Sequence, residues 1–169
     1  MENRKPLRLR NYDYSSAGAY FITICAQNRR QIFSRIERSL PDNVGAGLAP
    51  PAIQYTEYGK IAKQQLENLP QRYPFLEIDR YVIMPDHIHI IFIIREDTGG
   101  ASPAPTISDI ICAYKSLTTR ECNKIRKTGQ IFQRSFFDRV IRNEKDYLEA
   151  LEYIENNPIR WQIDELYTE

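Results

Sequence analysis

The sequence predicts an α+β fold of the ferredoxin-like type, an antiparallel sheet with helices on one face. Three observations lead to this prediction. Strand-like and helix-like segments follow one another in the order β-α-β-β-α-β, and one further helix ends the chain. The length of 169 residues suits a single domain with a sizeable core. The hydrophobic content of 42% is ordinary for a globular protein. We expect the sheet face without helices to be available for a site or a partner.

Four segments have the β-branched and aromatic composition of strands. They are residues 19–30, 75–84, 87–95 and 131–141. Pro85 and Asp86 form a turn-favouring pair between the second and third of them, which predicts a tight antiparallel connection.

Three segments show helical spacing or capping signals. They are residues 55–73, 106–125 and 143–158. Thr56 can cap the first, which we expect to end near Pro70. The second carries an apolar stripe at Ile107, Ile110, Ile111, Tyr114 and Leu117. We expect Asn143 to cap the third and Pro158 to stop it.

The organisation predicted is one domain over residues 1–169. Residues 1–18 read as a basic N-terminal arm, and the Gly/Ala/Pro-rich stretches 41–54 and 97–106 as surface loops. The net charge of +1 excludes a uniformly basic protein but leaves room for a basic face.

The three cysteines are scattered, odd in number and without CxxC spacing, which favours free, core-filling thiols in a reducing compartment. The N-terminus lacks the apolar segment of a signal peptide, and no apolar run reaches membrane-spanning length. We therefore expect a cytosolic protein without membrane contact.

The only two histidines, His87 and His89, stand one residue apart in an apolar strand segment. Residues i and i+2 of a strand point to the same face, so the two imidazoles can bind one metal ion, which needs at least one more ligand. The alternative is a pair of hydrogen-bonded histidines on a sheet face. Asp86 can orient a histidine from behind or serve only as a turn residue.

The last helix offers the missing groups, because Tyr153 and Asn157 are four residues apart and share one helical face. An amide oxygen is a suitable ligand for Mg²⁺ or Mn²⁺. A phenolic oxygen can act as a nucleophile, although a free tyrosine has a pKa of about 10 and needs help at neutral pH. The plainer interpretation of Tyr153 is a half-buried aromatic residue.

The segments "PDHIHI", "FFDRVIRNEKDYLEALEYIENNP" and "RLRNYDYSSAGAYFIT" together resemble the single-tyrosine HUH transposases, in the branch of the REP-associated tyrosine transposases. The resemblance runs from about Arg8 to Trp161. It implies that Tyr153 is the nucleophile and that His87, His89 and Asn157 bind a divalent metal, Mg²⁺ or Mn²⁺. It also implies the ferredoxin-like fold and a location in the bacterial cytosol at the nucleoid.

The reaction implied by this resemblance is cleavage of single-stranded hairpin DNA, which leaves a 5′-phosphotyrosine link and a free 3′-hydroxyl. Rejoining to another 3′-hydroxyl completes strand transfer. Members of the family act as monomers or homodimers. Tyr147, six residues before Tyr153, faces another way at 3.6 residues per turn, and we expect it to pack rather than react.

Contacts with DNA are predicted at two places. The arm supplies Arg4, Arg8 and Arg10 for phosphates, with Tyr12 beside them, or it is a solvated tail. Arg139 and Arg142 can line a strand groove in which Phe136 and Phe137 stack on bases. The simpler interpretation of this segment is that both rings enter the core and the arginines are solvated.

Two other functions remain open from the sequence. One is a binding module that holds hairpin DNA without cutting it, although such a protein has no need for all four site residues. The other is a metal-dependent hydrolase in which Tyr153 is structural and no covalent intermediate forms.

Overall fold

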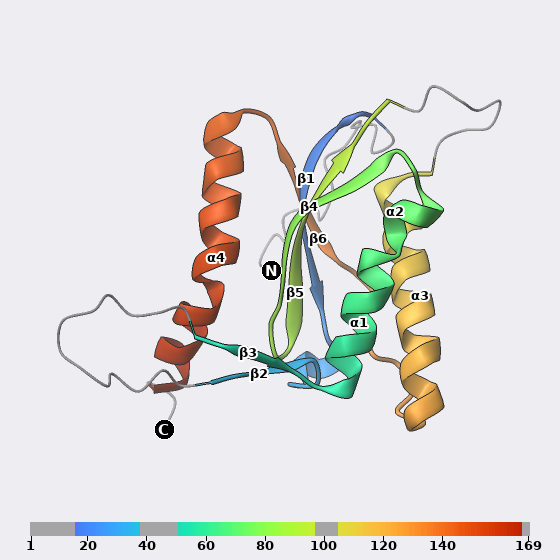
Figure 1. Ribbon diagram of the computed structural model, residues 1–169, viewed down its shortest axis with the longest axis vertical. Coiled ribbons are helices and arrows are strands. Elements are labelled where there is room, and N and C mark those ends of the chain that lie inside the picture. The colour runs from blue at the N-terminus through green and yellow to red at the C-terminus, as the bar shows by residue number, and fades with distance from the viewer. Residues whose placement is uncertain (1–15, 38–50, 97–104, 167–169) are drawn as a thin grey trace, which may run out of the picture.

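The computed structural model describes residues 16–37, 51–96 and 105–166 (Figure 1). The predicted DNA contacts Arg4, Arg8, Arg10 and Tyr12 lie outside these residues, as do residues 41–50 and 97–104 of the two predicted loops. The elements in chain order are β1 (Gly18–Cys25), the short 3-10 helix η1 (Gln27–Arg29), β2 (Ser34–Ile36), β3 (Ile53–Tyr55), α1 (Glu57–Glu67), α2 (Leu69–Arg72), β4 (Leu76–Ile83), β5 (His87–Ile94), α3 (Ile107–Ile125), β6 (Phe137–Ile141) and α4 (Glu144–Leu166).

The main sheet has four strands in the order β4-β5-β1-β6, and each neighbouring pair is antiparallel. The two central strands, β5 and β1, are thus the third and the first of the sheet along the chain. This is the split β-α-β arrangement that the sequence predicted, and the predicted fold class is confirmed.

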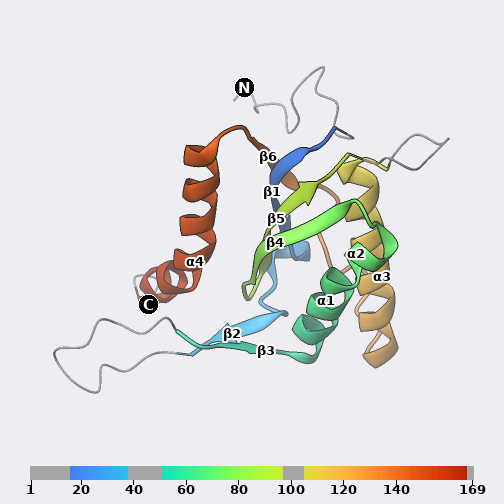
Figure 2. The same cartoon turned by 45° about the horizontal axis from the view of Figure 1, so that its top comes forward.

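The two faces of the sheet are covered differently (Figures 1 and 2). Helices α1 and α3 pack on one face over the main core, which the even-numbered residues of β1 and β5 supply; it includes Tyr20, Ile22, Ile88, Ile90 and Phe92. Helix α4 lies on the other face over a smaller cluster of Val82, Met84, Ile91, Ala150 and Ile154. The predicted site face is therefore partly covered by the helix that carries Tyr153.

Local signals explain where the helices begin. The Thr56 hydroxyl accepts a hydrogen bond from the amide of Gly59 at 3.1 Å and donates one to the carbonyl of Ile32 at 2.5 Å, which caps α1 and ties it to the preceding chain. A side chain at Gly59 would meet the carbonyl oxygen of Phe33 at 1.8 Å, so only glycine allows this close approach. Asn143 accepts from the amide of Asp146 at 2.8 Å, which confirms it as the cap of α4.

The structure corrects several boundaries. The predicted strand over 19–30 ends at Cys25, because the chain turns through η1, where Asn28 and Arg29 adopt left-handed φ values of 56° and 53°. Only Phe137–Ile141 of the segment 131–141 is regular strand. Gly18, assigned to the arm, begins β1, and Ile53 and Gln54, assigned to a loop, pair with β2. Strands this short carry too little periodicity to be found from sequence.

A further correction concerns Pro158, which lies inside α4 rather than at its end. Proline removes one helical hydrogen bond, so packing must stabilise the turns beyond it. Trp161 packs against the cluster below α4 together with Ile36 and Ile53 of the β2–β3 ribbon. The side-chain amide of Gln162 donates to the carbonyl of Glu37 at 2.6 Å. These tertiary contacts continue the helix past the proline.

Among the helices that the structure describes, none combines the length and the apolar character needed to cross a membrane.

Candidate active site

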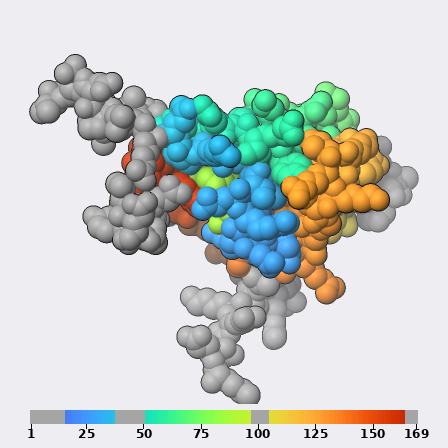
Figure 3. Space-filling model, turned by 90° about the horizontal axis from the view of Figure 1, so that it is seen from below, coloured from blue at the N-terminus to red at the C-terminus, as the bar shows by residue number. Residues whose placement is uncertain are grey.

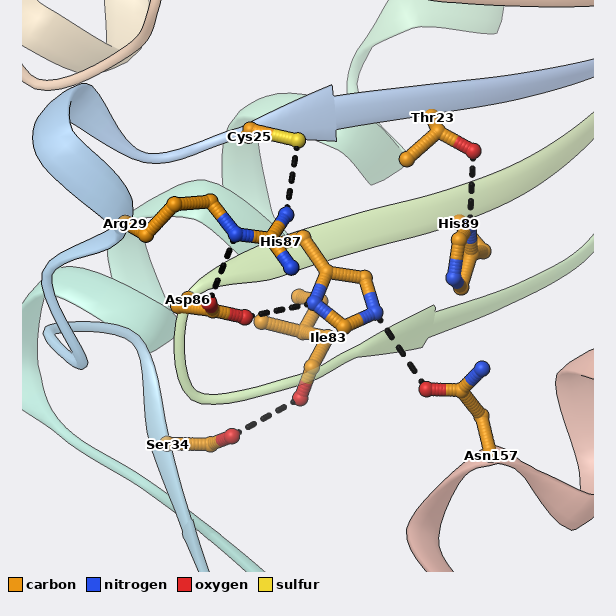
Figure 4. Close-up of polar contacts among 9 residues, drawn as sticks. All are labelled: Thr23, Cys25, Arg29, Ser34, Ile83, Asp86, His87, His89 and Asn157. Carbon is orange, nitrogen blue, oxygen red and sulfur yellow. Dashed lines mark hydrogen bonds and ion pairs between the residues drawn. The ribbon is translucent and has the colours of Figure 1, made fainter. Parts of the chain in front are cut away.

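The two histidines lie side by side on the face of β5 that α4 covers (Figure 4). Their ring centroids are 4.5 Å apart. On the neighbouring strand β1, Cys25 pairs with His87 and Thr23 pairs with His89. Figure 3 shows atoms of the β4–β5 region in yellow-green at the bottom of a hollow between the blue segment after β1 and the red of α4. The two-residue period of the strand places both imidazoles on the same face of β5, as predicted.

His87 is held from both ends of its ring. Its Nδ1 lies 2.6 Å from Oδ1 of Asp86, and its Nε2 lies 3.2 Å from Oδ1 of Asn157. A carboxylate only accepts, so Nδ1 carries the proton in this hydrogen bond. The Nε2 lone pair of a neutral ring then faces an amide oxygen that is also an acceptor. In this arrangement both atoms can bind one cation.

His89 is oriented in the same way by Thr23, whose Oγ1 lies 2.8 Å from Nδ1. Its Nε2 is buried and makes no hydrogen bond to any described residue. Burial, followed by the charges of His87 and Arg29, lowers the pKa of His89 from 6.5 to about 3. The imidazole is therefore neutral at physiological pH, which is the form that binds a metal.

Arg29 completes the arrangement behind His87, and sequence reasoning missed it. Its Nε lies 2.9 Å from Oδ2 of Asp86, and its Nη1 donates to Sγ of Cys25 at 2.9 Å. The left-handed turn at Asn28 and Arg29 brings this guanidinium back over the end of β1. A non-glycine residue in that conformation is strained, and the ion pair offsets the cost. In the sequence, the only sign of this turn is Asn28, because asparagine tolerates left-handed backbone angles better than most residues.

The cysteines are free, and only part of their predicted role is confirmed. Cys122 is buried in the main core, whereas Cys112 is exposed on α3. Cys25 is buried but borders the site cavity.

One face of α4 supplies the opposite wall of the site. Tyr153, Asn157, Arg160 and Trp161 follow at helical spacing, and all four line a cavity of about 460 Å³ together with both histidines and Arg29. The Tyr153 ring centroid is 5.1 Å from that of His89 and 5.9 Å from that of Phe21. The guanidinium of Arg160 lies 5.5 Å from the Tyr153 centroid. Arg160 was not predicted, although its position seven residues after Tyr153 places it two turns further along the same face.

Tyr147 points elsewhere, toward β4. Its hydroxyl donates to Oδ2 of Asp79 at 2.9 Å, and this hydrogen bond, followed by burial and the charge of Asp79, raises the pKa of Tyr147. Tyr147 is thus a poor nucleophile that fastens α4 to the sheet.

The predicted DNA-contact segment divides between the two faces of the sheet. Phe136 enters the core at 7% exposure, as the simpler interpretation expected, but Phe137 is 53% exposed, so that interpretation is wrong for the second ring. Arg139 forms ion pairs with Asp146 at 3.1 Å and Glu149 at 3.2 Å, which joins β6 to α4. Arg142 is exposed at the end of β6.

The donor set suits a divalent cation of the Mg²⁺ or Mn²⁺ type. Within the described residues no three His, Cys, Asp or Glu side chains gather around a common point. Two histidines and an amide oxygen do meet, and the buried Nε2 of His89 and the facing acceptors of His87 and Asn157 are the features that a bound cation accounts for.

Comparison with known proteins identifies the family of this chain's relatives. Residues 53–157 match the family model described as IS200-like transposase. An uncharacterized protein of Haemophilus influenzae is 34% identical over all of this chain and 96% of its own. The REP-associated tyrosine transposase of Escherichia coli K12 is 25% identical over 87% of this chain and 70% of its own. A solved structure titled as a REP-associated tyrosine transposase bound to a REP hairpin has a TM-score of 0.63 at 24% identity. It covers 90% of this chain and 73% of its own, and this likeness bears on the fold.

Proposed function

The chain belongs to the IS200-like transposase family, and we propose that it cuts and rejoins single-stranded hairpin DNA through a covalent link to Tyr153. The resemblance to the REP-associated tyrosine transposases is thereby confirmed. Transposases are enzymes that cleave and rejoin DNA, so the predicted enzyme class is confirmed as well. What we propose beyond this is a covalent intermediate, a divalent metal and a hairpin DNA substrate for this chain.

The observation that carries the proposal is the meeting of Tyr153 with His87, His89 and Asn157 around one cavity. The histidines come from β5 and the other two residues from α4, so the site exists only when α4 packs on the sheet. A tyrosine that merely packed would have no reason to share a cavity with a histidine pair and an amide oxygen.

His87, His89 and Asn157 are the residues that would hold a divalent ion. The ion would polarise a phosphoryl oxygen and stabilise the charge that develops during transfer. Asp86 would keep the Nε2 lone pair of His87 directed at the ion, and Thr23 would do the same for His89. Arg29 would hold Asp86 in place.

The chemical step exchanges one phosphodiester for another. The Tyr153 phenolic oxygen loses its proton and forms a bond to phosphorus, while the bond from phosphorus to the 3′-oxygen breaks and that oxygen leaves as a hydroxyl. The 5′-phosphotyrosine retains the energy of the original bond. A second 3′-hydroxyl can then attack the phosphorus and release the tyrosine, so strand transfer needs no further energy source.

Two cations border the same cavity and favour an anionic substrate. Arg29 lies at its β1 side and Arg160 at its α4 side, beside the Tyr153 ring. We assign to Arg160 the positioning of the tyrosine ring and attraction of the phosphodiester. Arg142, and Arg139 where its carboxylate partners allow, would contact phosphates further along the strand, and the N-terminal Arg4, Arg8, Arg10 and Tyr12 remain candidates for reading the hairpin.

The hairpin part of the proposal has its support in the relative whose structure is titled as bound to a REP hairpin. We therefore choose palindromic hairpins with single-stranded flanks, taken from the repeats beside the gene, as the first substrates.

Covalent trapping tests the proposal. Labelled hairpin oligonucleotides are incubated with the protein and Mn²⁺ or Mg²⁺, and the products are separated under denaturing conditions. We expect an adduct that Tyr153→Phe removes, that chelator removes, and that Tyr147→Phe leaves in place. Cleavage that survives Tyr153→Phe would instead identify a hydrolase. Tight binding of a hairpin with neither cleavage nor adduct in either metal would identify a binding module.

A further inference from the structure

A second cavity, of about 440 Å³, adjoins the first, and Tyr153 lines both. The apolar part of its wall consists of Phe21, Phe137, Ala150 and the Tyr153 ring. Thr23, Asp138, Arg139 and Glu149 supply the polar part. It shares Thr23, Phe137 and Tyr153 with the cavity that holds the histidines. The proposed reaction uses only the first of these two spaces.

The position of Phe137 follows from the sheet register. His89 pairs with Thr23, and Thr23 pairs with Phe137, so the three side chains form a row across β5, β1 and β6 on the site face. The row runs from a metal-binding candidate, through its hydrogen-bond partner, to an aromatic ring on the edge strand. Phe137 thus stands at the mouth shared by both cavities with 53% of its surface exposed.

An exposed phenylalanine beside a catalytic tyrosine has no role in the core. The main core takes its neighbour Phe136 instead. The other rings of the cavity are arranged around the same space, with Phe21 edge-on to Tyr153 at 5.9 Å between centroids. A flat apolar ligand that enters between Phe137 and these rings would bury aromatic surface on each side.

The charges around the two cavities match the two halves of a nucleotide. Arg29 and Arg160 border the histidine cavity, where the proposed phosphodiester reacts. The adjoining cavity is lined by aromatic rings and by the ion-paired Arg139 and Glu149, which offer donors and acceptors. A phosphate in the first space and the base attached to it in the second would fit this division.

We propose that the second cavity is a base-binding site, in which an unpaired nucleobase next to the scissile phosphodiester stacks on Phe137. This inference rests on the proposed function and adds the nucleotide that positions the bond at Tyr153. Every base has a face that stacks, so Phe137 supplies position more than sequence choice. One base–aromatic stack corresponds to about a 5- to 150-fold change in affinity.

A binding experiment tests the base site without requiring cleavage. The protein carries Tyr153→Phe, which keeps the ring and removes the hydroxyl. Hairpins carry 2-aminopurine on one or the other side of the expected cleavage position, and stacking quenches its fluorescence. We expect quenching at one of the two sides, its loss with Phe137→Ala, and its return with Phe137→Trp. Leu148→Ala is the matched control, because Leu148 is also 53% exposed on α4 but lines neither cavity.

A second measurement uses the protein with Tyr153 intact and compares adduct formation on normal and abasic oligonucleotides. We expect Phe137→Ala to slow adduct formation about tenfold or more on normal DNA and to have no additional effect once the flanking base is missing. Equal quenching in the Tyr153→Phe protein with and without Phe137→Ala would overturn the base site. An equal effect of Phe137→Ala on adduct formation with normal and abasic oligonucleotides would overturn it as well. Failure of the proposed function gives a different result, because wild-type protein would then form no adduct. The quenching experiment requires no cleavage, so it would still test the base site independently.

Discussion

The Nε2 atom of His87 lies 3.2 Å from Oδ1 of Asn157, a contact between residues 70 positions apart in the chain. It joins the central strand β5 to the helix that carries Tyr153, and it brings two acceptors together at the place proposed for the metal. In the proposed function, the packing of α4 on the sheet would therefore be linked to the binding of the metal.

Replacing Asn157 tests that link. We expect Asn157→Ala to lower adduct formation at limiting Mn²⁺ by tenfold or more, since one of three protein ligands is lost. Asn157→Asp keeps an oxygen at the same position and should retain most of the activity. The measurement is the adduct yield as a function of Mn²⁺ concentration. Identical Mn²⁺ curves for Asn157→Ala and the unmodified protein would exclude Asn157 as a ligand.

Asp86 is expected to act through His87. Asp86→Asn removes the carboxylate that fixes the His87 proton and pairs with Arg29. Loss of such a partner typically weakens metal binding by about 10- to 100-fold. The Mn²⁺ concentration for half-maximal adduct should rise accordingly, with the rate recovering at saturating metal. If Asp86 is only a turn residue, the Mn²⁺ requirement will not change.

Metal should also stabilise the folded protein. A ligand that binds only the folded state adds about 2.7 kcal/mol at one hundred times its Kd. We expect Mn²⁺ to raise the melting temperature, chelator to reverse the rise, and His89→Ala to remove it. Tyr147→Phe, which leaves the three ligands in place, provides the control. A rise that persists in His89→Ala would assign the metal to another site.

We expect Tyr147 to contribute to stability and Tyr153 to adduct formation. Tyr147→Phe deletes a hydrogen bond to Asp79, and such partly exposed bonds contribute about 0.5–1 kcal/mol to the free energy of unfolding. The adduct yield of Tyr147→Phe should stay at the level of the unmodified protein. Denaturant unfolding should show the small loss in the free energy of unfolding. An adduct that vanished in Tyr147→Phe but survived in Tyr153→Phe would reverse the two assignments.

The burial of His89 predicts a pH dependence of stability in metal-free buffer. Its pKa is about 3 in the folded protein against 6.5 for an ordinary histidine. Between these values the unfolded chain binds a proton that the folded chain does not. Stability is therefore fully present above pH 6.5 and falls as the pH drops toward 3, by up to about 1.4 kcal/mol per pH unit from this group.

Denaturant unfolding of the metal-free protein between pH 7 and pH 4 measures this contribution. His89→Gln carries no titrating ring, so its stability should fall less steeply over the same range. Parallel pH profiles for the two proteins would show that His89 does not have the lowered pKa.

Much of the site was predictable from the sequence because it depends on short-range periodicity. The two-residue repeat of a strand places His87 and His89 on one face, and the four-residue spacing of a helix does the same for Tyr153 and Asn157. Strand-forming composition and the caps Thr56 and Asn143 located the long elements. These patterns depend only on residues that are close together in the chain, and they are present in the structure.

Tertiary structure alone decided the rest, because those features depend on residues that are distant in sequence. Arg29 reaches Asp86 only through the left-handed turn after β1. The helix passes Pro158 because Trp161 and Gln162 find partners on the β2–β3 ribbon. Phe136 and Phe137 have the same side chain, and the strand register alone sends one into the core and the other to the mouth of the site. The sequence determined which groups are available for chemistry, and packing between the sheet and α4 determined where they meet.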